Sequence, residues 1–385
     1  MNAPCRILHM ITSLQMGGAE MALYRLATTL DPNLFRQSVI SLTRDKPVGD
    51  LIRSAGIPVE SLELRPGFPD PRGIFRLKRK ISAVDPDIVQ TWMYHADLMG
   101  GLAAKLAGSY PVVWNIRHTI TDKGSLKTST YRIASVNALL SRYLPTKIIC
   151  NANAAKQTHV AMGYDESKML VIENGFDLSR FVPDKTSRQD VRNELELPGN
   201  GKLIGMAARY HPQKDHANFV RAAALLLQKR QDVDFLLWGD NVDDSNLILA
   251  ELVHSLDLQN HVHMLGLRMD GQRLFSALDI ATLSSAYGEA FPQVIGEAMA
   301  CGVPCVVTDV GDSARIVENT GRVIPPRDPQ ALANAWDKLL SMPDVERTRL
   351  GLSARERIKN LFSIEVTTKK YSQVYQAITK KPVLE

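Results

Sequence analysis

Short β-branched apolar runs alternate with amphipathic stretches along the whole chain, and this pattern constrains the fold more than any other feature. Such alternation predicts parallel sheets with crossover helices on their faces. In the first series we expect strands at residues 5–12, 37–42, 87–92, 111–118, 146–152 and 169–175. In the second series we expect them at residues 202–209, 233–240, 261–266, 278–285 and 304–311. At 385 residues the chain exceeds the length at which one core usually stops growing, so each series should form its own domain.

The polar stretch GFDLSRFVPDKTSRQD lies between the two series, and its Gly175 and Pro183 are typical of a linker. We therefore expect an α/β protein with one doubly wound, Rossmann-like domain over residues 1–183 and a second over 184–362. Apolar residues at helical spacing predict a final helix over 363–385. Doubly wound sheets bind ligands at the carboxyl ends of their strands, so a cleft where the two domains face each other is the expected site.

The composition is that of a soluble globular protein, because 45% of the residues are apolar and 23% are charged. No run of about eighteen apolar residues is present, so we expect no membrane-spanning helix. The beginning, MNAPCRILHMIT, lacks a long apolar stretch and a small-residue cleavage site, which predicts no signal peptide. Four scattered cysteines favour buried thiols in a reducing compartment. We expect a cytoplasmic protein.

Charge is distributed unevenly along the chain. Residues 1–185 carry 23 Lys and Arg against 16 Asp and Glu, whereas residues 186–385 carry 23 against 25. A basic first half suggests an anionic partner there, such as a phosphate-bearing acceptor or an acidic membrane surface. A solvated basic face without a partner would give the same count, and the sequence leaves both open.

A Gly-Gly pair follows the first expected strand, in SLQMGGAE, and precedes a stretch with helical periodicity. Gly17 and Gly18 let the backbone approach a ligand closely, and the helix start offers N–H groups to an anion. A tight turn without a ligand is equally compatible with a pair of glycines. The G-x-G-x-x-G pattern of dinucleotide-binding dehydrogenases is absent at this point.

The segment SSAYGEAFPQVIGEAMACGVPCVVTDVG is the most specific in the chain. Pro292 suits the start of a helix over residues 293–300, and Gly302 ends it. Glu289 then lies in the loop before the helix and Glu297 lies within it. This placement lets the two carboxylates reach one bound molecule from different sides.

A phosphate-binding position is expected where this helix begins. The N–H groups of Phe291, Gln293 and Val294 should face outward there. A second cationic group follows the first strand of the second series, where Arg209 ends the strand and Lys214 lies in the polar loop after it. Two cations near a helix start suit a diphosphate leaving group, whose developing negative charge must be stabilised. Taken alone, the two cations would also fit an ordinary surface.

The chain resembles the retaining glycosyltransferases of family 4, which have the two-domain GT-B fold. The resemblance extends over nearly the whole length, because its landmarks follow one another in the family's order. They are MGGAE, DPDIVQTW, RHT, VIENGFDLSRFVP, ARYHPQKD, VHMLGLR and EAFPQVIGEAMACGVPCV. The last is similar to the E-x7-E motif of the family, with both glutamates present.

This resemblance implies that the first domain binds the acceptor, the second binds a nucleotide diphosphate sugar, and the C-terminal helix crosses back to the first domain. Arg209 and Lys214 would grip the donor diphosphate. Glu297 would bind the ribose hydroxyls, and backbone groups of Leu267 and Arg268 would meet the base.

The resemblance also implies which residues lie nearest the transferred sugar. Glu289 would contact hydroxyls of that sugar, and His118 would touch it from the first domain. Gly17 and Gly18 would lie beside the diphosphate and the incoming acceptor. Glu289, His118 and Gly18 are therefore the candidate catalytic residues.

Family resemblance implies transfer with retention and without a covalent intermediate, so Glu289 receives no role as nucleophile. Neither a metal nor another cofactor is expected, because Arg209 and Lys214 would neutralise the diphosphate. The expected donor is a UDP-sugar, with a GDP-sugar as the alternative. The expected acceptor is a hydroxyl of a glycan or of a polyprenyl-lipid-linked sugar in cell-surface polysaccharide or lipopolysaccharide synthesis, and no nucleic acid is expected.

Two other classes remain open, a sugar-nucleotide epimerase of similar architecture and a catalytically silent glycan- or nucleotide-binding relative. The chain also departs from the family at two positions. Ala290 stands where many relatives have Gly, and Trp92 stands where relatives often have His, for which His95 is the candidate substitute.

The stretch PRGIFRLKRKIS mixes apolar residues with five cations. A basic amphipathic helix of this kind lies on anionic membranes, which would bring the protein to a lipid-linked acceptor on the inner face of the cytoplasmic membrane. An ordinary crossover helix with a charged outer face is the alternative, and the sequence leaves both open.

Overall fold

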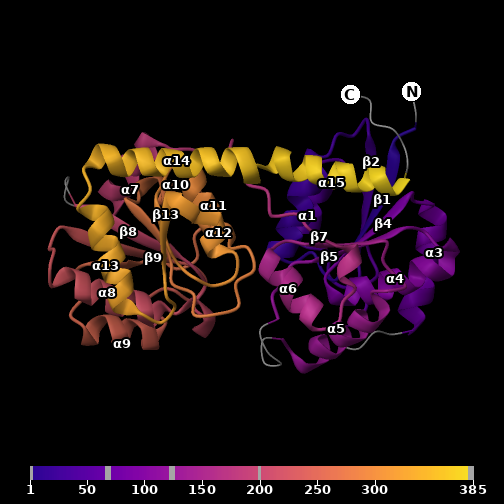
Figure 1. The fold of residues 1–385 in the computed structure, drawn as a ribbon, viewed down its shortest axis with the longest axis horizontal. Helices are drawn as coiled ribbons and strands as arrows, with labels where there is room; N and C mark the ends of the chain where they lie inside the picture. Colours follow the sequence, from indigo (N-terminus) through magenta and orange to yellow (C-terminus); the bar gives the residue numbers. More distant parts are fainter. Residues whose placement is uncertain (1–2, 66–70, 121–125, 198–200, 380–385) are drawn as a thin grey trace. The chain divides into compact units, whose positions relative to one another are not determined.

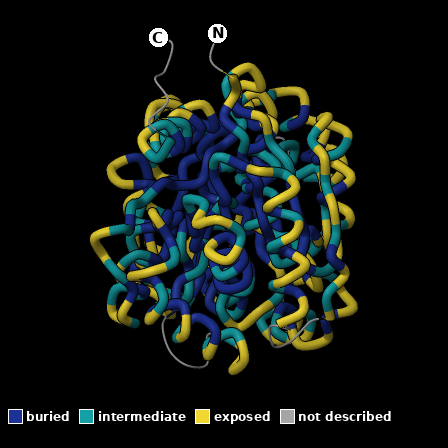
Figure 2. The backbone as a smooth tube through the Cα atoms, turned by 90° about the vertical axis from the view of Figure 1, so that its right-hand side faces the viewer, coloured by how far each residue is buried: buried dark blue, intermediate teal, exposed yellow. Residues whose placement is uncertain are grey.

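The computed structural model describes residues 3–65, 71–120, 126–197 and 201–379. These residues form two compact units, each an α/β sheet with helices on its faces (Figure 1). The first unit runs to Gly175 and also contains the C-terminal segment from Ile364, and the second is Phe176–Ser363. In Figure 2 the buried stretches of the backbone lie mostly inside, whereas the exposed stretches lie mostly at the outer turns.

A parallel sheet with the order β3-β2-β1-β4-β5-β6-β7 forms the centre of the first unit. Its strands are β1 (Cys5–Ile11), β2 (Phe35–Ser41), β3 (Val59–Ser61), β4 (Ile88–Trp92), β5 (Val112–Ile116), β6 (Lys147–Cys150) and β7 (Met169–Val171). Its helices are α1 (Gly18–Thr29), α2 (Val48–Ser54), α3 (Pro71–Val84), α4 (Tyr94–Gly108), α5 (Thr128–Leu140), α6 (Asn153–Ala161), the short η1 (Glu166–Lys168) and α15 (Ile364–Thr379).

The second unit repeats this order, as β10-β9-β8-β11-β12-β13. Its strands are β8 (Lys202–Ala207), β9 (Val233–Trp238), β10 (Val262–Met264), β11 (Ile280–Leu283), β12 (Cys305–Thr308) and β13 (Gly321–Ile324). Its helices are α7 (Lys185–Glu194), η2 (Pro212–Lys214), α8 (His216–Leu227), α9 (Leu247–Ser255), α10 (Gly271–Ala277), α11 (Gln293–Ala300), α12 (Ser313–Val317), η3 (Glu318–Thr320), α13 (Pro329–Leu340) and α14 (Asp344–Phe362). In each sheet the chain first adds strands on one side of the first strand and then on the other. The strand order therefore reverses between β1 and β4 and between β8 and β11, which is where doubly wound sheets bind ligands.

Every predicted run contains a strand, which confirms the predicted alternation and the doubly wound sheets. Two further strands, β3 and β13, were not predicted. Both are short and lie at an edge of their sheet, so they lack the continuous apolar run by which buried strands are recognised.

The second unit begins at Phe176, whereas the sequence predicted that the first domain would extend to residue 183. The difference arises because residues of this segment pack against the second unit. The ring of Phe176 lies against α11, where a Cβ on Gly296 would come within 2.0 Å of its Cζ atom. Further along, Arg355 Nη1 donates to the carbonyl oxygen of Phe181 at 2.7 Å. The segment is polar in composition, yet it packs as part of the second unit.

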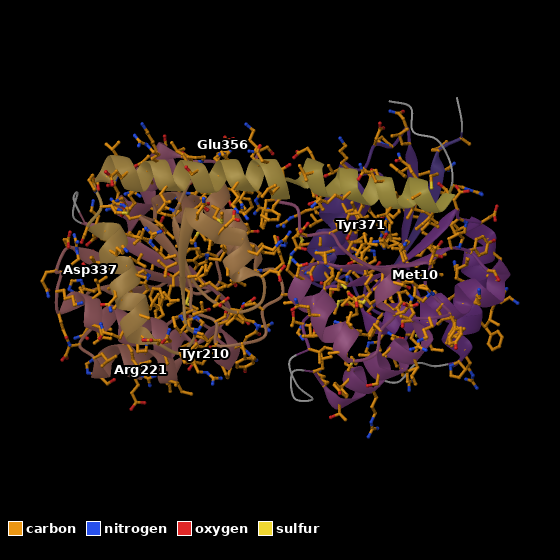
Figure 3. All side chains as sticks on the ribbon, viewed as in Figure 1. Met10, Tyr210, Arg221, Asp337, Glu356 and Tyr371 are labelled. Carbon is orange, nitrogen blue, oxygen red and sulfur yellow. The ribbon has the colours of Figure 1, made fainter. Side chains whose placement is uncertain are left out.

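The helix α15 belongs to the first unit, as the resemblance implied. Tyr371 and Tyr375 lie in the apolar core of that unit, and Figure 3 shows Tyr371 on the side of α15 that faces the sheet. The hydroxyl of Tyr371 accepts from Asn115 Nδ2 at 2.6 Å, and the hydroxyl of Tyr375 donates to Gln90 Oε1 at 2.6 Å. These buried contacts join the end of the chain to the central strands.

All four cysteines are buried and free, as expected. Burial raises the pKa of the Cys301 thiol to about 12 and raises that of Cys305 as well. Both thiols are therefore protonated at neutral pH. In the part of the chain that the structure describes, no helix is long and apolar enough to cross a membrane.

Candidate functional site

Two loops meet at the carboxyl ends of β8 and β11, where the order of the second sheet reverses. The Oγ atom of Ser284 donates to the carbonyl oxygen of Lys214 at 2.9 Å, and the backbone N–H of Ala286 donates to that of Gln213 at 2.8 Å. Residues far apart in the chain are thereby held at one edge of the sheet, in the position where ligands bind to this class of fold.

A charged cluster lies at this junction. Lys214 Nζ is 2.5 Å from Glu289 Oε1, and Ser285 Oγ donates to the same carboxylate oxygen at 2.6 Å. The side chain of Glu289 is only 7% exposed and that of Lys214 19%. Burial of two charges is tolerated because they face each other and a hydroxyl adds a further bond. The cluster thus offers an ammonium group and a carboxylate side by side.

Local sequence places Lys214 in this position. His211 caps η2, since its Nδ1 atom accepts from the N–H of Gln213 at 3.2 Å, and Pro212 begins the turn. Asp215 follows in the left-handed conformation with φ 51° and caps α8 by accepting from the N–H of Asn218. The tight turn between the two caps directs Lys214 toward the edge of the sheet.

Glycine at position 311 fixes the loop that carries Glu289. Gly311 has φ 62°, and a Cβ on it would lie 2.3 Å from the carbonyl oxygen of Glu289. The N–H of Asp312 donates to the carbonyl oxygen of Ala290 at 2.9 Å. Ala290 does not adopt a positive φ. The alanine that departs from the family pattern is therefore accommodated without strain.

The helix α11 begins at Gln293, immediately after Pro292, as predicted. Its first turn contains no acidic side chain, so its positive end is not neutralised by a carboxylate of its own. Glu289 lies outside the helix and Glu297 lies within it, half-buried, which confirms their predicted positions. Val294 is also half-buried, in the first turn.

Aromatic packing holds the start of α11. Phe291 is buried, with its ring centroid 6.0 Å from that of Phe176 and 5.3 Å from that of Phe362. Its side chain therefore anchors the loop that carries Glu289. This packing role was not foreseen from the sequence, because both partners are distant in the chain.

Arg209 follows β8 and is exposed. Within the described ranges its side chain makes no hydrogen bond or ion pair, so it does not join the cluster of Lys214 and Glu289. The strand end before it is closely packed, since a Cβ on Gly239 would lie 2.2 Å from the carbonyl oxygen of Ala208. The guanidinium of Arg209 is thus available to an anion at the same edge of the sheet.

Leu267 and Arg268 lie in the loop after β10. Leu267 is exposed, whereas the Arg268 guanidinium binds both oxygens of Asp270, at 2.8 and 2.7 Å, and also Glu194. Hydrogen bonding from Arg268 lowers the pKa of Asp270 to about 2. The side chain of Arg268 is therefore engaged within the protein, and its binding to a base through the backbone stays a prediction.

In the first unit, Gly17 directly precedes α1 and Gly18 is its first residue. The expected anion position at this helix start is occupied in part. A Cβ on Gly17 would come within 2.4 Å of Glu20 Oε2, so a carboxylate of the protein itself lies at this helix start. Burial raises the pKa of Glu20, and bonds from its own N–H and from Ser13 oppose this shift. Around Gly18, by contrast, the position of a Cβ is open.

Glu20 was not among the predicted site residues. An acidic residue in the first turn of a helix is stabilised by the helix dipole, and its presence in MGGAE could have identified it. Ser285, the partner of Glu289, was also missed. The contact between Ser285 and Glu289 depends on the conformation of the loop that connects them, and their separation in the sequence does not predict that conformation.

His118 follows β5 and is half-buried. Trp92 is fully buried, and its Nε1 atom donates to His9 Nδ1 at 3.4 Å, so it belongs to the core rather than to a ligand site. His95 lies half-buried in the first turn of α4, where burial lowers its pKa. It is therefore neutral at physiological pH.

Among the residues that the structure describes, no three His, Cys, Asp or Glu side chains gather in a way that could hold a metal ion. The sequence contains two Asp-x-Asp triplets, at residues 85–87 and 232–234. Asp85, in the first of them, binds Arg6 at 3.0 Å. Asp232, in the other, binds Arg230 at 3.1 Å. Both carboxylates have local cationic partners.

Two family models match the chain. The model described as "Glycosyltransferase Family 4" matches residues 16–180, and that described as "Glycosyl transferases group 1" matches residues 187–357. The chain is 26% identical to the Escherichia coli UDP-Gal:alpha-D-GlcNAc-diphosphoundecaprenol alpha-1,3-galactosyltransferase, over 80% of this chain and 79% of that protein. It is 28% identical to the D-inositol 3-phosphate glycosyltransferase of Corynebacterium urealyticum, over 73% of this chain and 70% of that protein.

Solved structures show the same fold. The crystal structure of Anabaena HepE in complex with UDP has a TM-score of 0.84 at 24% identity and covers 97% of this chain and all of its own. A glycosyltransferase from Rickettsia africae has a TM-score of 0.83 at 22% identity, over 98% of this chain and all of its own. The fold of the chain is thus that of two-domain proteins built from paired Rossmann-like sheets.

Proposed function

Because the chain belongs to glycosyltransferase family 4, with the GT-B fold, we propose that it transfers a sugar from a UDP-sugar to a hydroxyl of a glycan or lipid-linked acceptor. The pathway proposed is synthesis of cell-surface polysaccharide or lipopolysaccharide at the cytoplasmic side of the membrane. The observation that carries the proposal is the cluster of Lys214, Glu289 and Ser285 beside the start of α11.

In the proposed donor complex, Arg209 and Lys214 bind the diphosphate together with backbone groups of Phe291, Gln293 and Val294. The positive end of α11, which has no carboxylate in its first turn, adds to this anion site. Charge that develops on the leaving diphosphate is then stabilised by fixed cations, without a metal ion. Glu297 binds the ribose, and the backbone at Leu267 and Arg268 meets the base.

Transfer with retention is proposed to use the leaving diphosphate to deprotonate the acceptor hydroxyl on the same face. Oε1 of Glu289 accepts from both Lys214 and Ser285, which makes this oxygen a poor nucleophile. Glu289 is therefore assigned to binding the transferred sugar, with Gly18 and His118 on the acceptor side. Orientation of the substrates and electrostatic stabilisation would provide most of the rate acceleration.

Uridine is the favoured base and guanosine the alternative. Support comes from the Escherichia coli relative, whose donor is UDP-Gal, and from HepE, which binds UDP. That relative and the inositol 3-phosphate enzyme both act on acceptors that carry phosphate. The strongly basic first half of the chain supports an acceptor of the same kind here.

The test is a thermal-shift screen of UDP- and GDP-sugars with and without EDTA, followed by product analysis by NMR. A UDP-sugar should stabilise the protein regardless of EDTA, and the glycoside formed should keep the anomeric configuration of the donor. Inversion, or loss of activity with EDTA, would refute that part of the proposal. Release of nucleotide with an epimerised free sugar would identify an epimerase, and the absence of turnover with any donor would identify a silent relative.

A further inference from the structure

A cavity of about 580 Å³ opens at the carboxyl ends of β1, β2 and β3 in the first unit. Its lining comes from the end of β3 and from the three loops that follow these strands: Gln15, Thr43, Arg44, Asp45, Lys46, Ser61, Glu63, Leu64 and Arg65. Gln15 lies two residues before Gly17, so the cavity adjoins the turn that is proposed to meet the acceptor.

Hydrogen bonds between the loops build the floor of this cavity. The carbonyl oxygen of Arg44 accepts from the N–H of Leu14 and from Ser41 Oγ, each at 2.8 Å. Thr43 Oγ1 donates to the carbonyl oxygen of Thr12 at 2.8 Å, and Ser61 Oγ donates to the carbonyl oxygen of Thr43. The backbone that carries Arg44 is therefore fixed on both sides.

The charges in the cavity leave two arginines unmatched. Asp45 is bound by Arg53, which also donates to Asp50 at 2.9 Å, and this pairing lowers the pKa of Asp45. In the described part of the chain, the side chains of Arg44 and Arg65 make no hydrogen bond or ion pair, and both are exposed. Glu63 is the remaining carboxylate of the lining, so cations prevail.

We propose that this cavity binds a phosphate or diphosphate group of the acceptor through Arg44 and Arg65, with Gln15 available to a neighbouring hydroxyl. Guanidinium groups bind phosphate oxygens in pairs and are the side chains best suited to this task. The inference rests on the proposed transfer of a sugar and adds the class of acceptor. That acceptor is a phosphorylated one, either a lipid-linked sugar diphosphate or a soluble sugar phosphate.

The experiment compares wild type with the double variant Arg44→Gln/Arg65→Gln on three acceptors. These are N-acetylglucosamine diphosphate on a short isoprenoid chain, N-acetylglucosamine 1-phosphate, and an alkyl N-acetylglucosaminide without phosphate. The double variant should raise KM for the two phosphorylated acceptors at least tenfold and leave KM for the neutral glycoside unchanged. Equal effects on all three acceptors, or no effect, would overturn the proposal.

A matched control removes two charges from the opposite edge of the same sheet. Arg36 and Lys147 are exposed at the amino ends of β2 and β6, and Arg36→Gln/Lys147→Gln should leave every KM unchanged. Affinity for UDP and hydrolysis of the donor without acceptor should be those of wild type in both variants. A loss of either in the Arg44→Gln/Arg65→Gln variant would show that it acts on the donor side, contrary to the proposal.

Binding measurements separate failure of the inference from failure of the proposed function. If wild type transfers no sugar, calorimetry with N-acetylglucosamine 1-phosphate tests the cavity directly. Binding by wild type that the double variant loses would support the cavity, and its absence in wild type would refute it. Preference of wild type for the isoprenoid diphosphate would identify a lipid as the source of the phosphate, and preference for N-acetylglucosamine 1-phosphate would identify a soluble acceptor.

Discussion

Glu289 and Lys214 form an ion pair in this structure, although each is proposed to bind a different part of the donor. A buried carboxylate left alone would carry a large desolvation cost, which the contacts with the ammonium group and with Ser285 offset. In the proposed donor complex, the diphosphate is a second partner for Lys214. The ion pair would then hold a cation close to where negative charge develops.

Replacing Lys214 by Ala is expected to weaken binding of the UDP-sugar by about tenfold to a hundredfold, because a charge-assisted bond to phosphate is lost. Isothermal calorimetry measures the effect, with circular dichroism to check folding. Lys229→Ala, at an exposed position on the second unit, should bind like wild type. Wild-type affinity in the Lys214 variant would exclude the proposed diphosphate site.

Glycine at position 311 is required by both its conformation and its surroundings. Gly311→Ala should lower the free energy of unfolding of the second unit by more than the ~1–2 kcal/mol that a left-handed alanine costs, because its Cβ would meet the carbonyl oxygen of Glu289. Gly266→Ala is the control, since its φ of 64° is similar and the nearest atom is the end of the Asp243 side chain, at 3.1 Å. Urea unfolding measures both variants, and equal losses would contradict the steric argument.

At the scale of elements, α15 acts as a buried part of the first unit. Tyr375→Phe should lower the free energy of unfolding by about 1–3 kcal/mol, because Gln90 Oε1 loses its donor in a site without water access. Ser372→Ala on the same helix removes only a half-buried bond to the carbonyl oxygen of Thr368 and should cost less. A denaturant titration followed by circular dichroism compares the two, and equal costs would show that the bond to Gln90 adds nothing.

The helix α3 has the two faces that its sequence predicts. Leu77 and Ile81 are buried on the side that packs on α4, whereas Phe75, Arg76 and Arg79 are exposed. Lys80 is engaged with Glu60 at 2.5 Å and contributes less to the outer face. An aromatic ring flanked by cations is suited to the headgroup region of an anionic membrane.

We predict that Arg76→Ser/Arg79→Ser reduces cosedimentation with vesicles containing anionic lipid, because two cations near the surface are each worth about 1 kcal/mol. Vesicles of neutral lipid should bind neither form. Lys338→Ser/Arg349→Ser removes two exposed charges from the second unit and should leave binding intact. Absence of binding by wild type would assign α3 to an ordinary crossover role.

At the scale of the whole molecule, buried histidines make stability depend on pH. Burial lowers the pKa of His9, His159 and His216 to about 4, well below the ordinary value of 6.5. The unfolded chain therefore binds more protons than the folded one between these values, and stability falls as the pH drops from about 6.5 to about 4. Two of the three lie in the first unit, which should be the more sensitive to acid.

The expected slope is at most about 1.4 kcal/mol per pH unit for each such histidine. Urea unfolding at pH 7 and pH 5 measures it, and His159→Gln should make the pH dependence shallower, whatever it does to stability at pH 7. His254 is exposed, so His254→Gln should leave the dependence as in wild type. An unchanged slope in the His159 variant would show that this residue is not kept neutral by burial.

Much of the fold follows from short-range features of the sequence. Apolar runs give the buried strands, and Pro292 and Gly302 set the ends of α11, so these local signals alone place Glu289 outside that helix and Glu297 inside it. The edge strands β3 and β13 could not be predicted in this way. Their residues pair on one side only and need no continuous apolar run.

The sequence by itself determined the two doubly wound units and the residue types at the site, because periodicity and helix ends depend on neighbours within a few positions. Only the tertiary structure decided which side chains meet. Lys214 and Glu289 are 75 positions apart, and Phe176 packs against Gly296 of α11 and against Phe291 in the loop before it. Such contacts arise where parallel strands bring their carboxyl ends to one edge, and spacing along the chain does not specify them.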